Sequence, residues 1–170
     1  MALVKALGNR VPRIASSVFL AETAVVVGEV EIADAASVWY GAVLRADVGH
    51  IRIGARTNVQ DLACIHMTGG VSHAEIGSEV TIGHSAVLHG ARVGDGVLVG
   101  MGSVVLDNAE IGDESIIAAG SVVPPNMVVP AGVLVRGIPG RVVRQLGSEE
   151  RLQGRQGASV YLELAALHRG

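Results

Sequence analysis

The fold of this chain is decided by residues 93–135, which read VGDGVLVGMGSVVLDNAEIGDESIIAAGSVVPPNMVVPAGVLV. An aliphatic residue occupies every sixth position of this stretch without a break, at Val93, Val99, Val105, Ile111, Ile117, Val123, Val129 and Val135. A period of six matches neither the period of an α-helix nor the alternation of a lone strand. It is typical of hexapeptide repeats, in which each repeat forms one side of a triangular coil and stacked coils bury one another's apolar side chains.

The same period extends towards the N-terminus with two interruptions and with one residue dropped between Leu88 and Val93. The aliphatic positions there are Ile14, Leu20, Val26, Ile32, Val38 and Leu44, then Ile53, Val59 and Ile65, then Ile76, Ile82 and Leu88. We treat the interruptions, residues 45–52 and 67–75, as loops extruded from corners of the coil. Residues 1–146 are thus predicted to form an all-β domain, a single-stranded parallel β-helix. Hexapeptide-repeat families imply that it is left-handed.

A different pattern follows the repeats. From Ser148, a candidate N-cap, apolar residues lie near helical spacing, at Leu152, Val160, Tyr161, Leu164 and Leu167. We therefore predict that residues 147–170 form a C-terminal α-helix that packs along the β-helix.

The composition limits the classes of function. Hydrophobic residues make up 49% of the 170 residues and charged residues 17%, so the chain is a folded domain. The net charge of −3, with no basic run, argues against nucleic acid or an anionic membrane as a partner. No segment is apolar for long enough to span a membrane. Cys64 is the only cysteine, which together with the absence of a signal peptide predicts a cytoplasmic protein.

The register of the repeats gathers histidines. Three hexapeptides make one coil, so Leu44, Ile65 and Leu88 are expected on the same face of successive coils. The residue after each then lies at one corner, which gives a vertical column of Arg45, His66 and His89.

A third histidine, His84, is predicted at a different corner of the triangle. One side of the triangle spans about six residues of strand, or roughly 20 Å, so His84 cannot reach His66 and His89 of its own chain. A neighbouring subunit could bring its His84 there, and three subunits around a three-fold axis would close this contact into a ring. The same packing would place Arg45 of one chain opposite Asp61 of the next.

Three histidines with an open fourth position form the arrangement that catalytic zinc prefers. Iron and cobalt suit the same ligands, so the sequence does not select the metal. The alternative is that these are solvated corner histidines. We interpret His50, His73 and His168 in that way, as surface residues.

Several motifs resemble the γ-class carbonic anhydrase family, especially its short bacterial members. They are SVWYGAVLRADV, IGARTNVQDLACIH and EVTIGHSAVLHGARVGDGVLVGMGSVVLDNAEIG, followed by AAGSVVPPNMVVPAGVLVRGIPGRVVR, and they cover most of residues 37–144. The resemblance implies a homotrimer with His66, His84 and His89 as ligands of zinc, iron or cobalt, and no organic cofactor.

The resemblance also implies roles for residues around the metal. Gln60 would hydrogen-bond the reacting hydroxide, and Asn58 would assist at the site of carbon dioxide or bicarbonate. Arg45 and Asp61 would form an ion pair between subunits. Asp47 would lie in the pocket, and Tyr161 would lie at its rim.

Two departures from the family pattern concern proton transfer. The founding member has a glutamate after the aspartate of RxD, where this chain has Val48. The founding member also carries a longer acidic loop with a proton-shuttling glutamate, where this chain has only MTGGVSHAE. His50, His73 and Tyr161 remain as candidate proton carriers.

The leading hypothesis is a lyase that hydrates carbon dioxide reversibly to bicarbonate. Three alternatives stay open: a coenzyme A-dependent acyltransferase with a histidine base, a metal-dependent thioesterase, and a carbonic anhydrase-like scaffold with little activity. Three histidines in matched register favour the metal site over the acyltransferase. Gln60 and Asn58 count against the scaffold, because a structural metal would not need them.

Overall fold

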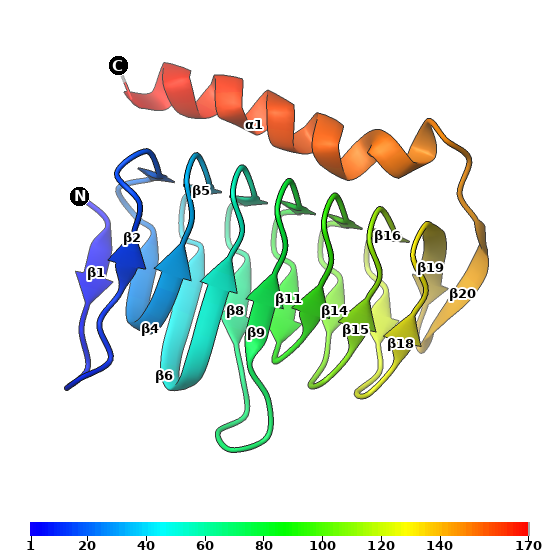
Figure 1. The fold of residues 1–170 in the computed structure, drawn as a ribbon, viewed down its shortest axis with the longest axis horizontal. Helices are drawn as coiled ribbons and strands as arrows, with labels where there is room; N and C mark the ends of the chain where they lie inside the picture. Colours follow the sequence, from blue (N-terminus) through cyan, green and yellow to red (C-terminus); the bar gives the residue numbers. More distant parts are fainter. Residues whose placement is uncertain (170) are drawn as a thin grey trace.

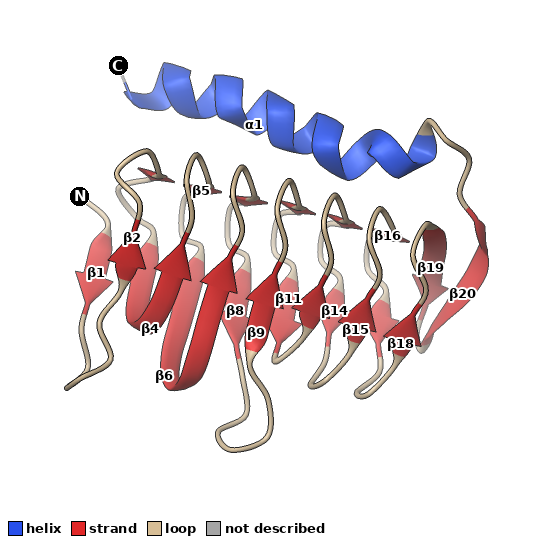
Figure 2. Ribbon diagram, viewed as in Figure 1, coloured by secondary structure: helices blue, strands red, loops and turns tan. Residues whose placement is uncertain are grey.

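The computed structural model describes residues 1–169 as a stack of parallel coils, with one helix along an edge of the stack (Figure 1). The chain winds through three flat faces in each coil, and the short strands of successive coils pair in parallel. The parallel β-helix of hexapeptide repeats is confirmed, with its C-terminal helix (Figure 2).

Each face is a column of short strands. One face consists of β3 (Phe19–Leu20), β5 (Ser37–Val38), β7 (Asn58–Val59), β10 (Thr81–Ile82), β13 (Leu98–Val99), β16 (Ile116–Ile117) and β19 (Val133–Gly137). The second consists of β8 (Cys64–His66), β11 (Val87–His89), β14 (Val104–Val105) and β17 (Val122–Val123). The third consists of β9 (Ala74–Ile76), β12 (Arg92–Val93), β15 (Glu110–Ile111) and β18 (Val128–Val129).

The N-terminal coils join the second and third faces through two long strands. The strands in this part are β1 (Leu3–Lys5), β2 (Arg13–Ile14), β4 (Val25–Ile32) and β6 (Val43–Ile53). β4 pairs with β1 and β2 and, on its other side, with β6, which in turn pairs with both β8 and β9.

The predicted register of the apolar positions is confirmed. Leu44 pairs with Ile65, and Ile65 pairs with Leu88, so the three residues form one vertical stack. All three are fully buried, as are Val59 and Ile82 on the first face. The core is therefore a column of aliphatic side chains, each packed on its equivalent one coil away.

The prediction that residues 45–52 form an extruded loop is wrong, because they belong to β6. β4 pairs with β6 on both sides of a corner, through Gly28 with Ala46 and Val30 with Ile51. At this corner one residue of β4 and four residues of β6 are unpaired. The three additional residues of β6 form a bulge in a continuous strand, which accounts for the three-residue slip. The loop between β8 and β9 does project from the stack (Figure 1).

The chain leaves the coil through β20 (Gly140–Gln145), which is antiparallel to β19. A short 3-10 helix, η1 (Glu150–Leu152), leads into α1 (Gln153–Arg169). The expectation that Ser148 caps the helix is wrong, since helical structure begins two residues later and the preceding Glu149 makes no side-chain cap. Arg144 of β20 forms a salt bridge with Glu150 of η1 at 2.7 Å, and this contact connects the start of the helical segment to β20.

Two glycines let α1 lie close against the coil. A Cβ at Gly154 would be 2.1 Å from the Gly96 carbonyl oxygen, and a Cβ at Gly157 would be 2.4 Å from Thr81 Oγ1. Neither distance is sterically possible, so both positions need glycine although glycine weakens helices. Further along, α1 covers a second apolar cluster through Ala165. No helix in residues 1–169 is long and apolar enough to cross a membrane.

The close approach at Gly154 yields a test of the helix packing. Gly154→Ala should favour the isolated helix by about 1 kcal/mol, yet we expect it to lower the thermal denaturation midpoint because the overpacked contact costs about 1–3 kcal/mol. Gln156→Ala, at an exposed position of α1, is the control and should change the midpoint little. A Gly154→Ala protein as stable as the wild type would show that α1 does not seat against Gly96.

Candidate metal centre

His66 and His89 end two adjacent strands at one corner of the coil. β8 and β11 pair in register, with His66 directly opposite His89. His66 Nδ1 lies 3.2 Å from His89 Nε2. The two rings therefore converge because the hexapeptide register stacks their strands.

A carboxylate holds the outer nitrogen of each ring. His66 Nε2 lies 2.9 Å from Asp47 Oδ1, and His89 Nδ1 lies 3.2 Å from both oxygens of Asp107. Since an ionised carboxylate only accepts hydrogen bonds, each of these nitrogens carries the proton in the neutral ring. The two nitrogens that face each other then both present lone pairs, which suits a cation placed between them.

Asp107 was missed by the sequence analysis. It follows His89 by 18 residues, or one coil, so extending the histidine column by one more coil would have found it. Ser72 donates a hydrogen bond to Asp107, and so does Thr68 at 3.0 Å, both from the loop between β8 and β9. Burial raises the pKa of Asp107, but these hydroxyls and His89 outweigh it and hold the pKa below its ordinary value.

Asp47, which was expected to lie in the pocket, is in the bulge of β6 and contacts His66. Arg45 donates a hydrogen bond to the second oxygen of Asp47 within the same chain. Burial raises the pKa of Asp47, but the hydrogen bonds from His66 and Arg45 more than compensate and lower it below its ordinary value. Asp47 is thus ionised at neutral pH and orients the His66 ring.

His84 lies at a different corner. His84 Nδ1 is 2.8 Å from Asp61 Oδ2, and His84 Nε2 is 3.4 Å from the Tyr161 hydroxyl on α1. Burial raises the pKa of the Tyr161 phenol above its ordinary value, and Asp61 adds to the effect. Within residues 1–169 of one chain, no group of three or more His, Cys, Asp or Glu side chains is placed to hold a metal. One chain brings together His66 and His89 but not His84.

Gln60 and Asn58 form a buried pair of amides near His84. Gln60 Nε2 donates to Asn58 Oδ1 at 3.0 Å, and Asn58 Nδ2 donates to Thr81 Oγ1 at 3.0 Å. Asn58 is 1% exposed and Gln60 is 6% exposed. Buried amides with fixed partners are rigid, so this pair presents a defined hydrogen-bonding pattern.

A cleft of about 440 Å³ adjoins this corner. Its lining includes the polar residues Gln60, His84 and Tyr161 and apolar residues such as Leu98 and Ile116 from the coil face. It can therefore hold an uncharged ligand beside the amide pair.

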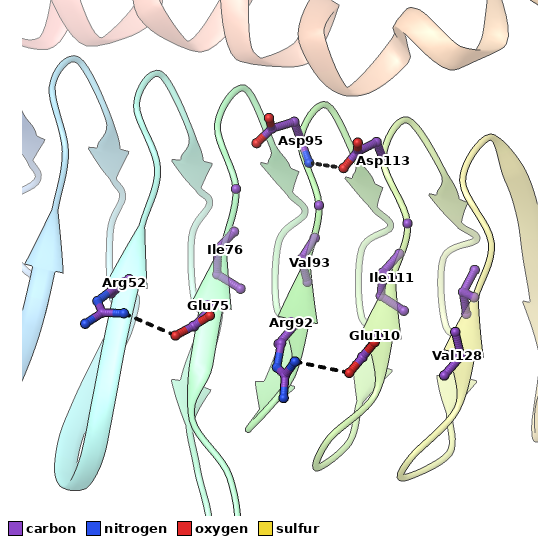
Figure 3. A pocket seen from close by; sticks show the side chains of 14 residues that line it. Arg52, Glu75, Ile76, Arg92, Val93, Asp95, Glu110, Ile111, Asp113 and Val128 are labelled. Atoms are coloured by element: carbon purple, nitrogen blue, oxygen red, sulfur yellow. Dashed lines mark hydrogen bonds and ion pairs between the residues drawn. The ribbon is translucent and has the colours of Figure 1, made fainter.

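A larger cleft of about 620 Å³ on the third face does not contain the histidines (Figure 3). Four of its charged side chains are paired across strands, Arg52 with Glu75 at 3.3 Å and Arg92 with Glu110 at 3.2 Å, and Asp95 and Asp113 accept backbone hydrogen bonds. The interactions resemble the cross-strand pairs of any sheet surface, with no unpaired group directed at a ligand. We assign it no role in the site.

The other three histidines lie apart from these clusters. His73 is exposed and stacks on His50, with ring centroids 3.9 Å apart, and His50 Nε2 is 3.2 Å from Glu75. His168 is exposed on α1, and its Nδ1 is 2.8 Å from the hydroxyl of Tyr40. The expectation of surface positions fits His73 and His168, whereas His50 is partly covered by its neighbours.

Comparison with known proteins agrees with this architecture. Residues 90–125 match the model of the family described as bacterial transferase hexapeptide (six repeats). A crystal structure from Bacillus cereus, described as a candidate acetyltransferase, superposes with a TM-score of 0.95 at 34% identity, covering 98% of this chain and 96% of that one.

Several relatives carry carbonic anhydrase names. A Methanocaldococcus jannaschii protein named "probable carbonic anhydrase" is 51% identical over 152 residues, which cover 89% of this chain and 95% of the relative. The mitochondrial gamma carbonic anhydrase 2 of Arabidopsis thaliana is 40% identical over 94% of this chain, which spans 59% of that protein's length. With its coil register and these relatives, the chain belongs to the γ-class carbonic anhydrase family of hexapeptide-repeat proteins.

Proposed function

We propose that this protein is a homotrimeric, cytoplasmic, metal-dependent carbonic anhydrase, with each site shared between two subunits. His66 and His89 of one subunit and His84 of the next would be the ligands. One observation carries the proposal: each of these rings has one nitrogen held by its own aspartate, and its other nitrogen faces a second histidine or, for His84, the Tyr161 hydroxyl at 3.4 Å. A histidine that binds a metal through one ring nitrogen commonly donates a hydrogen bond from the other nitrogen to a carboxylate.

The residues present fit a divalent metal ion. Zinc bound to two histidine nitrogens at about 2.0–2.1 Å in tetrahedral geometry separates them by about 3.3 Å, and His66 Nδ1 and His89 Nε2 are 3.2 Å apart. Zinc is our first choice, with iron or cobalt as alternatives. When bound, such a metal lowers the pKa of a coordinated water to about 7, which supplies a nucleophile at neutral pH.

The corner that carries His84 has the character of an interface. Its neighbours on the coils above and below, Leu62 and Met101, are 67% and 58% exposed. Exposed apolar residues that flank a polar ligand favour burial against another chain. A neighbouring corner with His66 and His89 would be the counterpart, and a three-fold ring would close the contact. Arg45 and Asp61 are then expected to pair across it.

The remaining residues would handle the substrate. Gln60 and Asn58 provide fixed amides for hydrogen bonds to the reacting oxygens. The apolar lining beside them suits carbon dioxide, which is uncharged. Tyr161 would limit access at the rim, and Asp47 would keep His66 oriented.

A second candidate function is the hydrolysis of a small acyl thioester at the same metal. The cleft of about 440 Å³ is larger than carbon dioxide requires, and its apolar lining suits an acyl group. The B. cereus structure is described as a candidate acetyltransferase, which is consistent with acyl chemistry, although fold alone does not determine function. Release of coenzyme A from acetyl-coenzyme A, measured with the protein used below, decides between the two reactions.

The proposed reaction is tested by stopped-flow carbon dioxide hydration. Protein reconstituted anaerobically with zinc, and separately with iron, should accelerate hydration, and removal of the metal by a chelator should abolish the rate. His66→Ala should lose at least about 100-fold, because the site loses one of only three ligands. His168→Ala is the control, since it changes an exposed histidine that is neither a ligand nor a candidate proton carrier. Absence of any rate with either metal would rule out the reaction.

The shared site is tested by mixing two inactive variants. His84→Ala and His66→Ala homotrimers should each bind no metal. In a mixed trimer, one interface can join intact His66 and His89 from the first variant to intact His84 from the second. Metal content measured after remixing should therefore recover at that interface alone. If mass spectrometry shows mixed trimers that still hold no metal, the ligands do not come from two subunits.

The role of Asp107 gives a test through metal affinity. Asp107→Asn removes the charge that holds His89 Nδ1, so the affinity for zinc should fall by about 10–100-fold. Asp113→Asn is the matched control, because Asp113 accepts a backbone hydrogen bond from Asp95 on a corner without ligands. Competition titration with a zinc chelator measures both. An unchanged affinity in Asp107→Asn would mean that His89 is not a ligand or is held by other contacts.

A further inference from the structure

A single chain of buried hydrogen bonds runs from the candidate site to α1. Gln60 donates to Asn58, Asn58 donates to Thr81 Oγ1, and Thr81 donates to the carbonyl oxygen of Gly154 at 2.8 Å. Thr81 is 4% exposed, and both amides are buried as well. The first turn of the helix is therefore connected to the amides beside His84.

The carbonyl of Gly154 sets the direction of every bond in this chain. A carbonyl only accepts, so the single hydroxyl proton of Thr81 is used there, and Thr81 offers a lone pair towards Asn58. The Asn58 amide nitrogen must face that lone pair, and it also lies 3.3 Å from the Val80 carbonyl oxygen, a second acceptor. Asn58 Oδ1 is consequently directed at Gln60, whose amide nitrogen donates to it.

The far end of the chain is Gln60 Oε1. This oxygen makes no hydrogen bond within the described part of the chain, residues 1–169. No buried side-chain nitrogen or oxygen there lacks a partner, so Oε1 is accessible, and Gln60 lines the cleft beside His84. The free end thus presents an acceptor, and only a ligand with a hydrogen to donate satisfies it.

We infer that Thr81 is a positioning residue, which with the Gly154 carbonyl fixes Gln60 as an acceptor and makes the site select ligands that carry an O–H group. Bicarbonate has such a group, whereas nitrate has the same planar shape and charge without it. A fixed acceptor places a lone pair against nitrate oxygen, which disfavours it. The choice of bicarbonate as the ligand rests on the proposed function, whereas the direction of the hydrogen bonds follows from the structure.

Helix α1 packs directly against Thr81. Gly157 packs so closely on Thr81 that a Cβ would be 2.4 Å from Oγ1. A larger residue there would push the hydroxyl from its place between Asn58 and Gly154. The position of α1 and the polarity of the amides are therefore linked through one side chain.

The first measurement is nuclear magnetic resonance of the side-chain amides of Asn58 and Gln60. Thr81→Val keeps the shape but loses the hydroxyl, so the Asn58 amide protons should exchange with solvent at least about fivefold faster, the loss of one neutral hydrogen bond. Thr81→Ser should retain the wild-type exchange. Ser115→Ala is the matched control, because it removes a buried hydroxyl that also joins a carbonyl, that of Pro130, away from these amides.

The second measurement is the ratio of affinities for bicarbonate and nitrate, titrated on the zinc-reconstituted protein. The wild type and Thr81→Ser should prefer bicarbonate, and the preference should fall about fivefold in Thr81→Val. An unchanged ratio or unchanged amide exchange in Thr81→Val would overturn the inference. So would an equal change in Ser115→Ala, which would indicate general destabilisation. If the amides respond as expected but the wild type does not hydrate carbon dioxide, only the proposed function fails.

Discussion

The parallel backbone pairing between successive coils is the constraint on which the rest of this structure depends. It stacks Leu44 on Ile65 and Ile65 on Leu88, and these buried side chains allow no slip between coils. A shift of one residue would turn the aliphatic positions outward and the polar ones inward. The residue that follows each aliphatic position is therefore fixed as strictly as the core, and this is how His66 comes to lie opposite His89.

The departures from the regular repeat lie next to these histidines. The bulge of β6 supplies Asp47 to His66, and the loop after β8 supplies Thr68 and Ser72 to Asp107, which in turn holds His89. Asp107 stands at a periodic position, whereas Asp47 and the hydroxyls of Thr68 and Ser72 come from the irregular segments. Irregular segments in repeat proteins often carry the groups that act on ligands.

The C-terminal helix contributes to the same region rather than only covering the coil. It brings Tyr161 to His84, and its Gly154 carbonyl accepts the hydrogen bond from Thr81. Glycines at two positions of its first turns allow this approach, although they weaken the helix by itself. The two glycines thus lower the stability of the isolated helix but permit close contact with the face that carries Asn58 and Gln60.

The sequence alone determined the coil, its faces and the stacking of His66 on His89, because a period of six leaves one way to stack aliphatic residues. It also separated His84 from these two histidines, since strand length excludes contact within one chain. The sequence did not determine the continuous strand through residues 45–52, because a three-residue slip is compatible with either a loop or a bulge until its partner β4 is known.

Asp107 as the partner of His89, and the link from Thr81 to Gly154, were likewise decided only by the tertiary structure. Asp107 follows His89 by one coil, but the period does not indicate that its side chain turns towards His89 Nδ1, and no repeat relates Thr81 to Gly154 of the helix. The geometry of these contacts depends on side-chain directions and on helix seating, which periodicity does not encode. The pattern of the sequence thus fixed the backbone register, whereas packing between unlike elements chose the hydrogen bonds around the site.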